Sequence, residues 1–589
     1  MEFKKLSCVD CEVYPNYFLA AFKTPKGKVM NIEARDGVLD KMDLRRLQYA
    51  MMKRTTFGFN SRNYDIPIIL SALKGATTEQ IHKVSDWIID NGKPGWLTSQ
   101  HFNLGDPNWP HFDLQEPAPG VMVGLKLYGA RMHSPRLQDL PYEPGTHLTP
   151  EQMDDVRDYC ENDLDTTIDL FKAIRPQLEL RQVMSKAYNQ DLMSKSDAQI
   201  AETVLKASKP SVKKPKIPES KKFSYNTPDF LHFKSQQLQD ALNVIEDHKF
   251  EIDGRGSIKL PDELRKLKIT LGGSTYQMGI GGLHSTEKAQ TVVPTENQLL
   301  CDRDVASYYP SIILNLGLYP RQFGPQFLDT YRSIVDERLT AKRTGKKVKA
   351  DALKITINGS FGKLGSKYSA LYAPDLMMMV TLTGQLSLLM LIERLEGANI
   401  SVVSANTDGF VSLVDKEDYQ TYNDICFDWE LDTGFELEET RYKALYSRDI
   451  NNYLAVTEHG AKGKGVFAAQ GLMKNPVASI CVEAAKAYLI TGRSIKSYIE
   501  GCKDIKPFIT ARRVTGGAVW RGEYLGKVVR WVYTTDGEAI TYKKNGNKVA
   551  TSDGATPVMD MPDEIPNLDY NKYITMTEDI LKSVGVDYA

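Results

Sequence analysis

Two apolar runs that each lead into an aspartate constrain the fold of this chain most strongly. Asp304 opens the segment Asp304–Ser311, and Asp408 lies in Asn406–Gly409, which is entered from the apolar Ile400–Ser404. Strands that end side by side would bring the two carboxylates together, and Mg²⁺ prefers such oxygen ligands. Phosphoryl transfer to a 3′-hydroxyl needs two divalent cations rather than covalent help from the protein. Taken singly, an aspartate at a strand end is more often a turn residue.

The stretch between the two aspartates predicts a cationic helical hairpin. Lys354, Asn358 and Phe361 are spaced so that a helix places them on one face, and Arg338 and Lys342 lie four residues apart upstream. A turn at 343–347 would join two short antiparallel helices with their cations facing inward. Because Arg forks onto phosphate oxygens and Lys acts as a point charge, a nucleoside triphosphate fits this face. Considered alone, a solvated basic helix pair is the alternative.

The amino-terminal third carries a second set of carboxylates. Residues 6–11 predict a strand, and residues two apart on a strand point to the same face. A helix is predicted to begin at Thr149, because Thr149 and Gln152 form a capping box around Pro150. The strand would carry Asp10 and Glu12, and a loop that leads into a helix would carry Asp65. The helix that begins at Thr149 would carry Tyr159 and Asp163 on one face. Such a set suits two-metal hydrolysis of a phosphodiester, with the phenol orienting water.

The three central segments resemble a known family. Asp304–Ser311, Lys354–Gly362 and Asn406–Gly409 resemble motifs A, B and C of family B DNA polymerases, in the family's order. The departures are Tyr308 for Leu in motif A, Gly359 and Phe361 for Ser and Tyr in motif B, and Asn406 and Gly409 for Asp and Ser in motif C. Asn406 removes one negative charge beside the metals. In the family the second aspartate of motif C holds metal, so activity is expected to survive.

The resemblance implies a role for each matching residue. Asp304, Asp408 and the Val305 carbonyl are the expected ligands of two Mg²⁺ or Mn²⁺ ions. Tyr309 is expected to pack under the sugar of the incoming nucleotide. The remaining expected nucleotide contacts are Arg338, Lys342, Lys354 and Asn358, and the expected DNA contacts are Phe361, which would offer a flat surface to a base, and Gly362.

Three amino-terminal segments resemble the exonuclease motifs of proofreading polymerases. Asp10-x-Glu12, Asn60-x-x-x-Tyr64-Asp65 and Tyr159-x-x-x-Asp163 match those motifs without departure. The resemblance implies a second site that holds two metal ions through Asp10, Glu12, Asp65 and Asp163. Asn60 and Tyr64 would contact the single-stranded 3′ end of DNA.

The expected fold is a multidomain α/β protein, since 589 residues are too many for one core. It combines an RNase H-like exonuclease domain with a right-hand polymerase that has an antiparallel palm sheet, short helical fingers and a thumb. The expected boundaries are 1–190 for the exonuclease domain, 191–262 for a connecting segment, 263–330 and 364–465 for the palm, 331–363 for the fingers and 466–589 for the thumb. A hairpin is predicted around Asn545-Gly546.

Local charge is more informative than the net charge of −1. Basic stretches occur at 206–222, 338–349 and 512–531, and the last is interleaved with aromatic residues. Such stretches suit a groove that follows a phosphate backbone, although a solvated linker explains 206–222 equally well. The acidic stretches at 431–440 and 560–564 are expected to face solvent.

Composition predicts a cytoplasmic protein, in the host cytoplasm if the chain is phage-encoded. No signal peptide is recognised, and seven scattered cysteines fit a reducing compartment. The most apolar stretch, Leu376–Ile392, is interrupted by polar residues, so it predicts a buried helix and no membrane contact.

The short intervals between the central motifs refine the expected function. Asp304 and Asn358 are 54 positions apart, and Asn358 and Asp408 are 50 positions apart. Protein-primed phage relatives carry extra subdomains in both intervals, so no terminal-protein primer is expected here. The expected function is a monomeric, phage- or element-encoded DNA polymerase that extends primer–template DNA with deoxyribonucleoside triphosphates and proofreads single-stranded 3′ ends. The alternatives are a polymerase-like scaffold acting mainly as a 3′–5′ exonuclease and a primer-independent polymerase-primase.

Overall fold

The chain folds into two units. The computed structural model describes residues 5–120, 123–207, 209, 211–217 and 221–588. The first unit comprises residues 1–196, 470–481 and 496–574, and the second comprises 197–469, 482–495 and 575–589. The predicted thumb, 466–589, is therefore divided between the two units. Within the predicted basic run at 206–222, positions 208, 210 and 218–220 lie outside the described residues.

A mixed five-stranded sheet forms the centre of the first unit. Its strands are β1 (Leu6–Tyr14), β2 (Tyr17–Lys23), β3 (Val29–Arg35), β4 (Thr55–Gly58) and β5 (His111–Asp113), in the order β3-β2-β1-β4-β5. The β1–β2 and β2–β3 pairs are antiparallel, whereas β1–β4 and β4–β5 are parallel. The strand predicted at residues 6–11 is thus the central strand, and it continues to Tyr14.

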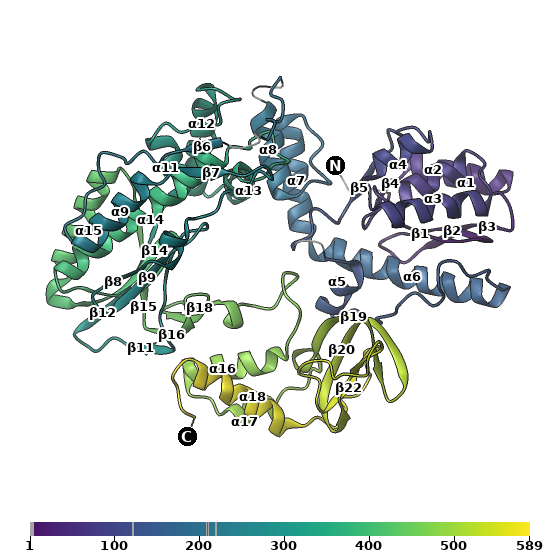
Figure 1. Cartoon of the computed structure of the whole chain (residues 1–589). Coiled ribbons are helices and arrows are strands. Elements are labelled where there is room, and N and C mark those ends of the chain that lie inside the picture. Colours follow the sequence, from purple (N-terminus) through teal and green to yellow (C-terminus); the bar gives the residue numbers. More distant parts are fainter. Residues whose placement is uncertain (1–4, 121–122, 208, 210, 218–220, 589) are drawn as a thin grey trace. The chain divides into compact units, whose positions relative to one another are not determined.

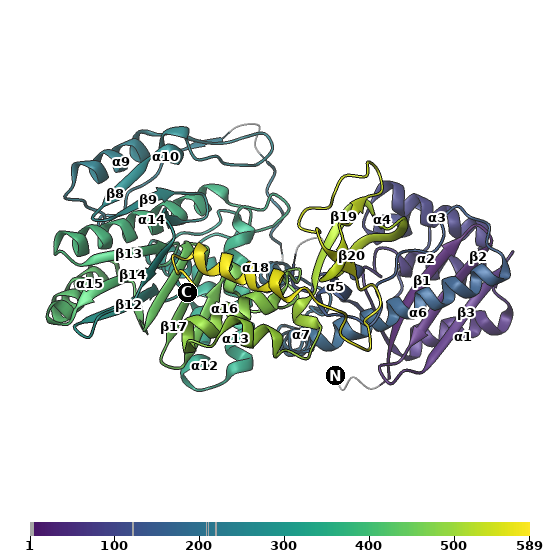
Figure 2. The ribbon, with the colours of Figure 1, turned by 90° about the horizontal axis from the view of Figure 1, so that it is seen from below.

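Helices cover both faces of this sheet (Figures 1 and 2). Helices α1 (Lys41–Lys53), α2 (Asp65–Leu73) and α3 (Thr78–Asn91) pack on one face, and α6 (Pro150–Ala173) packs on the other. The other helices in this part of the unit are α4 (Gly95–His101), α5 (Leu125–Arg131) and α7 (Arg175–Tyr188). The predicted capping box of α6 is confirmed, because Thr149 Oγ1 accepts from Gln152 N and Gln152 Oε1 accepts from Thr149 N.

A four-stranded antiparallel sheet forms the carboxy-terminal part of the first unit. Its strands are β19 (Thr510–Trp520), β20 (Glu523–Glu538), β21 (Thr541–Tyr542) and β22 (Ala555–Pro557). The predicted turn at Asn545-Gly546 is present, since Gly546 has φ +68° and its N–H donates to the Tyr542 carbonyl. The prediction that the basic stretch 512–531 follows a phosphate backbone is wrong for Arg530 and Trp531. Both are fully buried, and the guanidinium donates to the carbonyls of Ser134, Pro135, Val558 and Met559.

A seven-stranded antiparallel sheet forms the centre of the second unit. Its order is β15 (Leu437–Tyr442), β12 (Gln298–Val305), β14 (Gly409–Asp415), β13 (Ser401–Asn406), β10 (Leu283–Ser285), β9 (Ser274–Met278) and β8 (Lys268–Leu271). All seven strands lie within the two stretches predicted for the palm, 263–330 and 364–465. The two strands with the central aspartates, β12 and β14, are direct neighbours.

One face of this sheet is covered by α14 (Pro374–Gly397), together with α9 (Gln236–Asp247) and α15 (Tyr419–Thr433), as Figure 1 shows. Helix α14 is long and apolar enough to span a membrane, but 83% of its most apolar window is buried inside the protein. Trp429 of α15 donates its indole N–H to the Ser387 carbonyl of α14 at 2.9 Å. The prediction of a buried helix over Leu376–Ile392 is confirmed.

The other elements of the second unit surround this sheet. They are α8 (Asp197–Ala207), β6 (Lys221–Phe223), β7 (Phe250–Ile252), α10 (Asp262–Lys266), α11 (Tyr308–Asn315), α12 (Gln326–Arg343), α13 (Lys347–Leu364) and a second sheet of β11 (Gln290–Val292), β16 (Ala444–Asp449), β17 (Asn452–Thr457) and β18 (Gly460–Lys464). The boundaries between the units fall within α16 (Ser479–Thr491), α17 (Ile495–Glu500) and α18 (Tyr570–Ser583).

Candidate active sites

Asp304 and Asp408 lie together at the end of two paired strands in the second unit. Asp304 stands opposite Gly409 in the β12–β14 register, and Val305 N donates to the Asp408 carbonyl at 2.7 Å. A Cβ on Gly409 would overlap Asp304 Oδ1. A serine at this position would therefore require the Asp304 carboxylate to move from its present place.

The turn that carries Asp408 is strained. Thr407 has φ +36°, a conformation that costs a β-branched residue about 1–3 kcal/mol. The turn is held by Thr407 N, which donates to the Leu283 carbonyl at 2.7 Å, and by the Thr407 hydroxyl, which donates to Asn406 Oδ1 at 3.0 Å. The Asn406 side chain is thus engaged within the turn. Of the two residues, only Asp408 offers a carboxylate.

A hollow of about 260 Å³ opens beside the two aspartates. Burial and the neighbouring Asp302 and Asp408 carboxylates raise the pKa of Asp304 to about 6. Burial also raises the pKa of Asp408 and lowers the pKa of Lys464. The carboxylate pKa values are thus raised mainly by burial and, for Asp304, also by the neighbouring carboxylates, and a bound cation would offset both effects.

Sequence patterns missed several groups that line this hollow. Asp302 precedes Asp304 by two residues on β12 and so shares its face, and its carboxylate accepts a short hydrogen bond from the Tyr442 hydroxyl. Lys462 and Lys464 of β18 also line the hollow. The i, i+2 spacing of Asp302 and Asp304 was a usable signal. The lysines were not predictable, since they come from a different sheet.

Motif A changes from strand to helix within its length. Ser307 has φ +50°, and α11 begins at Tyr308, so the strand ends before the two tyrosines. Tyr308 is buried and donates to the Gly384 carbonyl at 2.6 Å. Tyr309 is only partly buried, donates to the Gly281 carbonyl at 2.8 Å, and its ring centroid lies 4.3 Å from that of Phe361. Tyr309 and Phe361 therefore form one aromatic wall.

The predicted helical hairpin is present as α12 and α13, joined at 344–346, and each helix has 18 residues. Arg338 donates to the Ser307 hydroxyl at 2.9 Å, which places this guanidinium beside motif A. Lys342 forms an exposed ion pair with Glu438 of β15 at 2.8 Å. On α13, Lys354, Asn358 and Gly362 are exposed. The structure thus brings Arg338 and Phe361 to the Asp304 segment and leaves Lys354 and Asn358 facing solvent.

Helix packing explains the departure at Gly359. A Cβ there would lie 2.8 Å from the Asp197 carbonyl oxygen and 2.9 Å from Ala201 Cβ, both in α8. The serine of the family pattern would push α8 away from α13, so the substitution reflects local packing of the hairpin.

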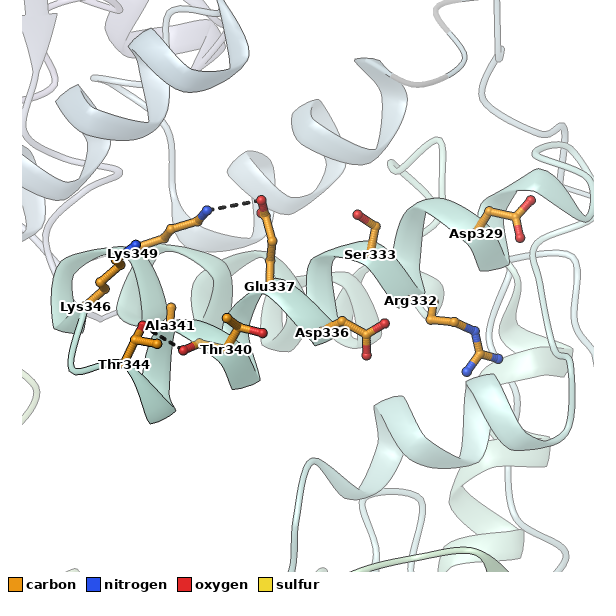
Figure 3. Close-up of a pocket in the computed structure, with 10 residues that line it drawn as sticks. All are labelled: Asp329, Arg332, Ser333, Asp336, Glu337, Thr340, Ala341, Thr344, Lys346 and Lys349. Atoms are coloured by element: carbon orange, nitrogen blue, oxygen red, sulfur yellow. Dashed lines mark hydrogen bonds and ion pairs between the residues drawn. The ribbon is translucent and has the colours of Figure 1, made fainter.

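The opposite face of α12 lines a separate hollow of about 660 Å³ (Figure 3). Asp336 and Thr340 line this hollow. Each is two residues away from Arg338 or Lys342, so its side chain points about 200° around the helix axis from theirs. Glu337 accepts from Lys349 at 3.1 Å across it (Figure 3). This hollow is therefore distinct from the face that carries Arg338 and Lys342.

The acidic residues of the stretch 431–440 are exposed, as predicted. Glu439 in addition pairs with Arg303 at 2.7 Å and with Arg441 at 2.6 Å. Arg303 and Glu439 are cross-strand neighbours in the β12–β15 register, so this pair ties the strand of Asp304 to β15.

The first unit assembles the second carboxylate set. Asp10, Glu12 and Cys160 place potential ligand atoms within 4.8 Å of one another, and the Cys160 thiol donates to Asp10 Oδ2 at 3.6 Å. Burial and Asp163 raise the pKa of Asp10 to about 7, and burial raises the pKa values of Glu12 and Asp163. Asp65 begins α2, is 3% exposed, and its Oδ1 has no hydrogen-bond partner among the described residues.

A lysine that sequence patterns missed lies at this site. Lys126 of α5 donates to the Tyr159 hydroxyl at 2.6 Å, and its ammonium lies 4.3 Å from the centre of that ring. Its charge lowers the pKa values of Asp10, Glu12 and Asp163 against the raising effect of burial. A single lysine within the apolar sequence Leu125–Tyr128 was the available signal.

The loop between β4 and Asp65 is fixed by a buried carboxylate that was also not predicted. Asp113 accepts from the backbone N–H groups of Asn60 and Arg62, each at 2.9 Å, and Asn60 has φ +57°. Tyr64 is partly buried, and its hydroxyl hydrogen-bonds Ser85 Oγ at 2.7 Å. The loop is therefore rigidly placed at the entrance to α2.

Comparison with known proteins adds little to this geometry. No family model and no curated protein matches the chain. A solved structure to which it is similar is that of the family B DNA polymerase from the hyperthermophilic archaeon Pyrobaculum calidifontis, with 15% identity, coverage of 98% of this chain and 77% of that chain, and a TM-score of 0.40. At that TM-score the likeness carries no argument about function.

Proposed function

We propose that the chain is a primer-extending DNA polymerase of the family B type with a separate 3′–5′ exonuclease site. The observation that carries the proposal is the juxtaposition of Asp304 and Asp408 on paired strands, faced by the Arg338 guanidinium and the Tyr309–Phe361 wall. The four carboxylates of the first unit support the exonuclease half. Its mixed sheet, covered by helices on both faces, supports an RNase H-like domain.

The residues present fit divalent metal ions in both sites. The donors are carboxylates, and their raised pKa values and the unpartnered buried Asp65 Oδ1 indicate charge that lacks a counter-charge. In the polymerase site the ions would be held by Asp304, Asp408 and the Val305 carbonyl. In the exonuclease site they would be held by Asp10, Glu12, Asp65 and Asp163. Bound Mg²⁺ or Mn²⁺ would activate the attacking oxygen and neutralise charge on the phosphate.

The chain's own side chains would then position the substrates. In the polymerase site the Arg338 guanidinium can fork onto phosphate oxygens, while Lys342 and Lys354 supply positive charge to the triphosphate. The Tyr309 ring would support the sugar, and Phe361 would stack against the base. In the exonuclease site the Tyr159 phenol, fixed by Lys126, would orient a water molecule, and Asn60 and Tyr64 would guide the 3′ end.

The contents of the two short intervals support priming by an ordinary oligonucleotide. Between Asp304 and Asn358 the described chain forms α11, α12 and most of α13, and between Asn358 and Asp408 it forms the end of α13, α14 and β13. Neither interval holds a further globular subdomain for a protein primer. We therefore propose that a free 3′-hydroxyl on DNA or RNA suffices.

Primer extension and exonuclease release on one labelled primer–template test the proposal. Template-directed extension together with degradation of single-stranded 3′ ends is the expected result. Degradation without any extension would favour the scaffold that acts mainly as an exonuclease. Synthesis on a circular template without primer would favour the polymerase-primase.

Tyr309→Ala should increase incorporation of ribonucleotides relative to deoxyribonucleotides by up to about 10²-fold. A 2′-hydroxyl forced against a fixed ring displaces the reacting atoms, and a displacement near 1 Å costs on the order of 10²-fold in rate. The ring is fixed by its hydrogen bond to Gly281 and its contact with Phe361. The ratio of kcat/KM for the two sugars measures the effect.

Tyr308→Phe is the matched control for this change. It keeps the buried ring and loses only the hydrogen bond to the Gly384 carbonyl, so sugar choice should remain unchanged. If Tyr308→Phe relaxes sugar discrimination and Tyr309→Ala does not, the assignment of the sugar-contacting residue is wrong.

Lys126→Met should move the pH profile of exonuclease activity to higher pH. Metal and protons compete for the carboxylates, so activity falls as pH drops through the Asp10 pKa of about 7. Removing the Lys126 charge raises the pKa values of Asp10, Glu12 and Asp163 further, so more Mg²⁺ is needed at neutral pH. Titration of activity with Mg²⁺ at several pH values measures this shift.

Lys172→Met provides the control, because this exposed lysine of α6 pairs with Asp169 at 2.9 Å. Its exonuclease pH profile should match that of the unaltered protein. An unchanged profile for Lys126→Met would show that the ammonium does not act on the carboxylates.

A further inference from the structure

Three segments of the second unit meet at the carboxyl end of α13. They are the described part of the basic run at 211–217, the turn at 253–257 and the loop at 365–372. The Tyr372 hydroxyl donates to the Gly256 carbonyl at 2.9 Å, and a Cβ on Gly256 would lie 3.4 Å from Lys367 Cβ and 3.5 Å from Ile217 Cδ1. The basic run is thus packed onto the body of the unit here.

The segments surround a shallow hollow of about 420 Å³ whose lining includes Arg255, Ser257, Ser366, Lys367 and Tyr368. The Tyr368 ring is 75% exposed, so packing does not explain it. The ammonium groups of Lys214 and Lys367 lie 5.1 Å and 5.4 Å from its centre. An exposed ring flanked by two cations can stack on a base while the cations meet the adjoining phosphates.

The charge of this surface is one-sided. Lys213, Lys214, Lys216 and Arg255 are exposed. The acidic groups near this surface are already engaged. Asp253 accepts from the N–H groups of Arg255 and Ser257 at 2.9 Å and lies 3.6 Å from the Arg255 guanidinium. Glu202 accepts from the Ala370 N–H at 2.7 Å, and Asp375 pairs with Lys221 at 2.7 Å. The excess of positive charge suits a polyanion.

The position of the surface in the chain points to the polyanion that it would meet. Phe361, whose ring packs against that of Tyr309, lies in the last turn of α13. Tyr368 lies in the loop that follows this helix. The surface therefore adjoins, along the chain, the segment that carries the Tyr309–Phe361 wall.

We propose that Tyr368, Lys214, Lys367 and Arg255 bind the unpaired template strand next to the polymerase site. This inference rests on the proposed function, which places the primer–template at the Tyr309–Phe361 wall. The ligand class is single-stranded DNA, recognised by stacking and phosphate charge and therefore without sequence preference.

The test is equilibrium binding of the full chain to labelled primer–templates with a single-nucleotide or a long template overhang, in chelator so that no reaction occurs. The unaltered protein should bind the long overhang more tightly. Tyr368→Ala should weaken that binding about tenfold and leave the short-overhang affinity unchanged. Tyr368→Phe should retain the affinity. Lys214→Ala should reduce the slope of log affinity against log salt by about 0.7.

Tyr49→Ala is the matched control, because Tyr49 of α1 is 64% exposed and lies in the first unit. It should bind both overhangs normally. Equal affinity of the unaltered protein for both overhangs, or equal losses by Tyr368→Ala on both, would overturn the inference. Because binding is measured without catalysis, failure of primer extension would instead contradict the proposed function.

Discussion

Asp304→Ala and Asp408→Ala should each abolish nucleotide incorporation. Each change removes a proposed metal ligand at the point where β12 meets the turn before β14. Loss of one preorganised charge-stabilising group already costs about 10²–10³-fold in rate, so a loss of at least about 10³-fold is expected. Single-nucleotide incorporation on a primer–template at saturating DNA measures it.

Asp415→Ala is the matched control, because Asp415 ends the same strand, β14, at the far end from Asp408 and is exposed. It should incorporate nucleotides at the native rate. Degradation of single-stranded 3′ ends should persist in all three variants, since the other carboxylates lie in the first unit. Near-native extension by Asp408→Ala would contradict the assignment of motif C.

The features of the sites that could be predicted from the sequence depend on the spacing of residues within a single helix or strand. The capping box at Thr149 and the i, i+2 pair of Asp10 and Glu12 depend only on helix and strand periodicity, and both appear in the structure as expected. The hairpin of α12 and α13 follows in the same way from spacing within each helix. Such features need no knowledge of which distant segments meet.

The parts that sequence did not predict depend on contacts between distant segments. Lys126 reaches Tyr159 from another helix, and Lys462 and Lys464 reach the polymerase hollow from a second sheet. Asp113 supports the loop at Asn60 from the neighbouring strand β5, which is more than 50 residues away in sequence. The strand-to-helix change at Ser307 depends on one residue with positive φ, which a serine rarely adopts. Periodicity therefore does not predict the start of the helix at Tyr308.

Two departures from the family pattern have local steric causes. Gly359 makes room for α8, and Gly409 makes room for the Asp304 carboxylate. A restored side chain should therefore harm each site. A serine at position 409 should therefore move the Asp304 carboxylate from its present place.

Asp10→Asn combined with Glu12→Gln should reduce degradation of single-stranded 3′ ends by at least about 10³-fold and leave synthesis intact. Both side chains face α6, where Cys160 contacts Asp10 and Asp163 raises its pKa. The amide side chains are close in size but carry no charge for a metal. Release of nucleotides from a labelled single strand measures degradation, and primer extension measures synthesis. Asp169→Asn on the exposed side of α6 is the control and should degrade DNA normally.

Thermal unfolding separates this catalytic effect from a loss of fold. An aspartate whose pKa rises from 3.8 to about 7 on folding binds its proton more tightly in the folded state. Above pH 4 the ionised form therefore destabilises the fold, and that penalty grows until pH passes about 7. Neutral amides remove the penalty, so the double variant should melt no lower than the unaltered protein at pH 8. Loss of synthesis with retained degradation would mean that the two sites are assigned the wrong way round. A lower melting temperature would show that the carboxylates are paired rather than crowded, and would contradict the metal site itself.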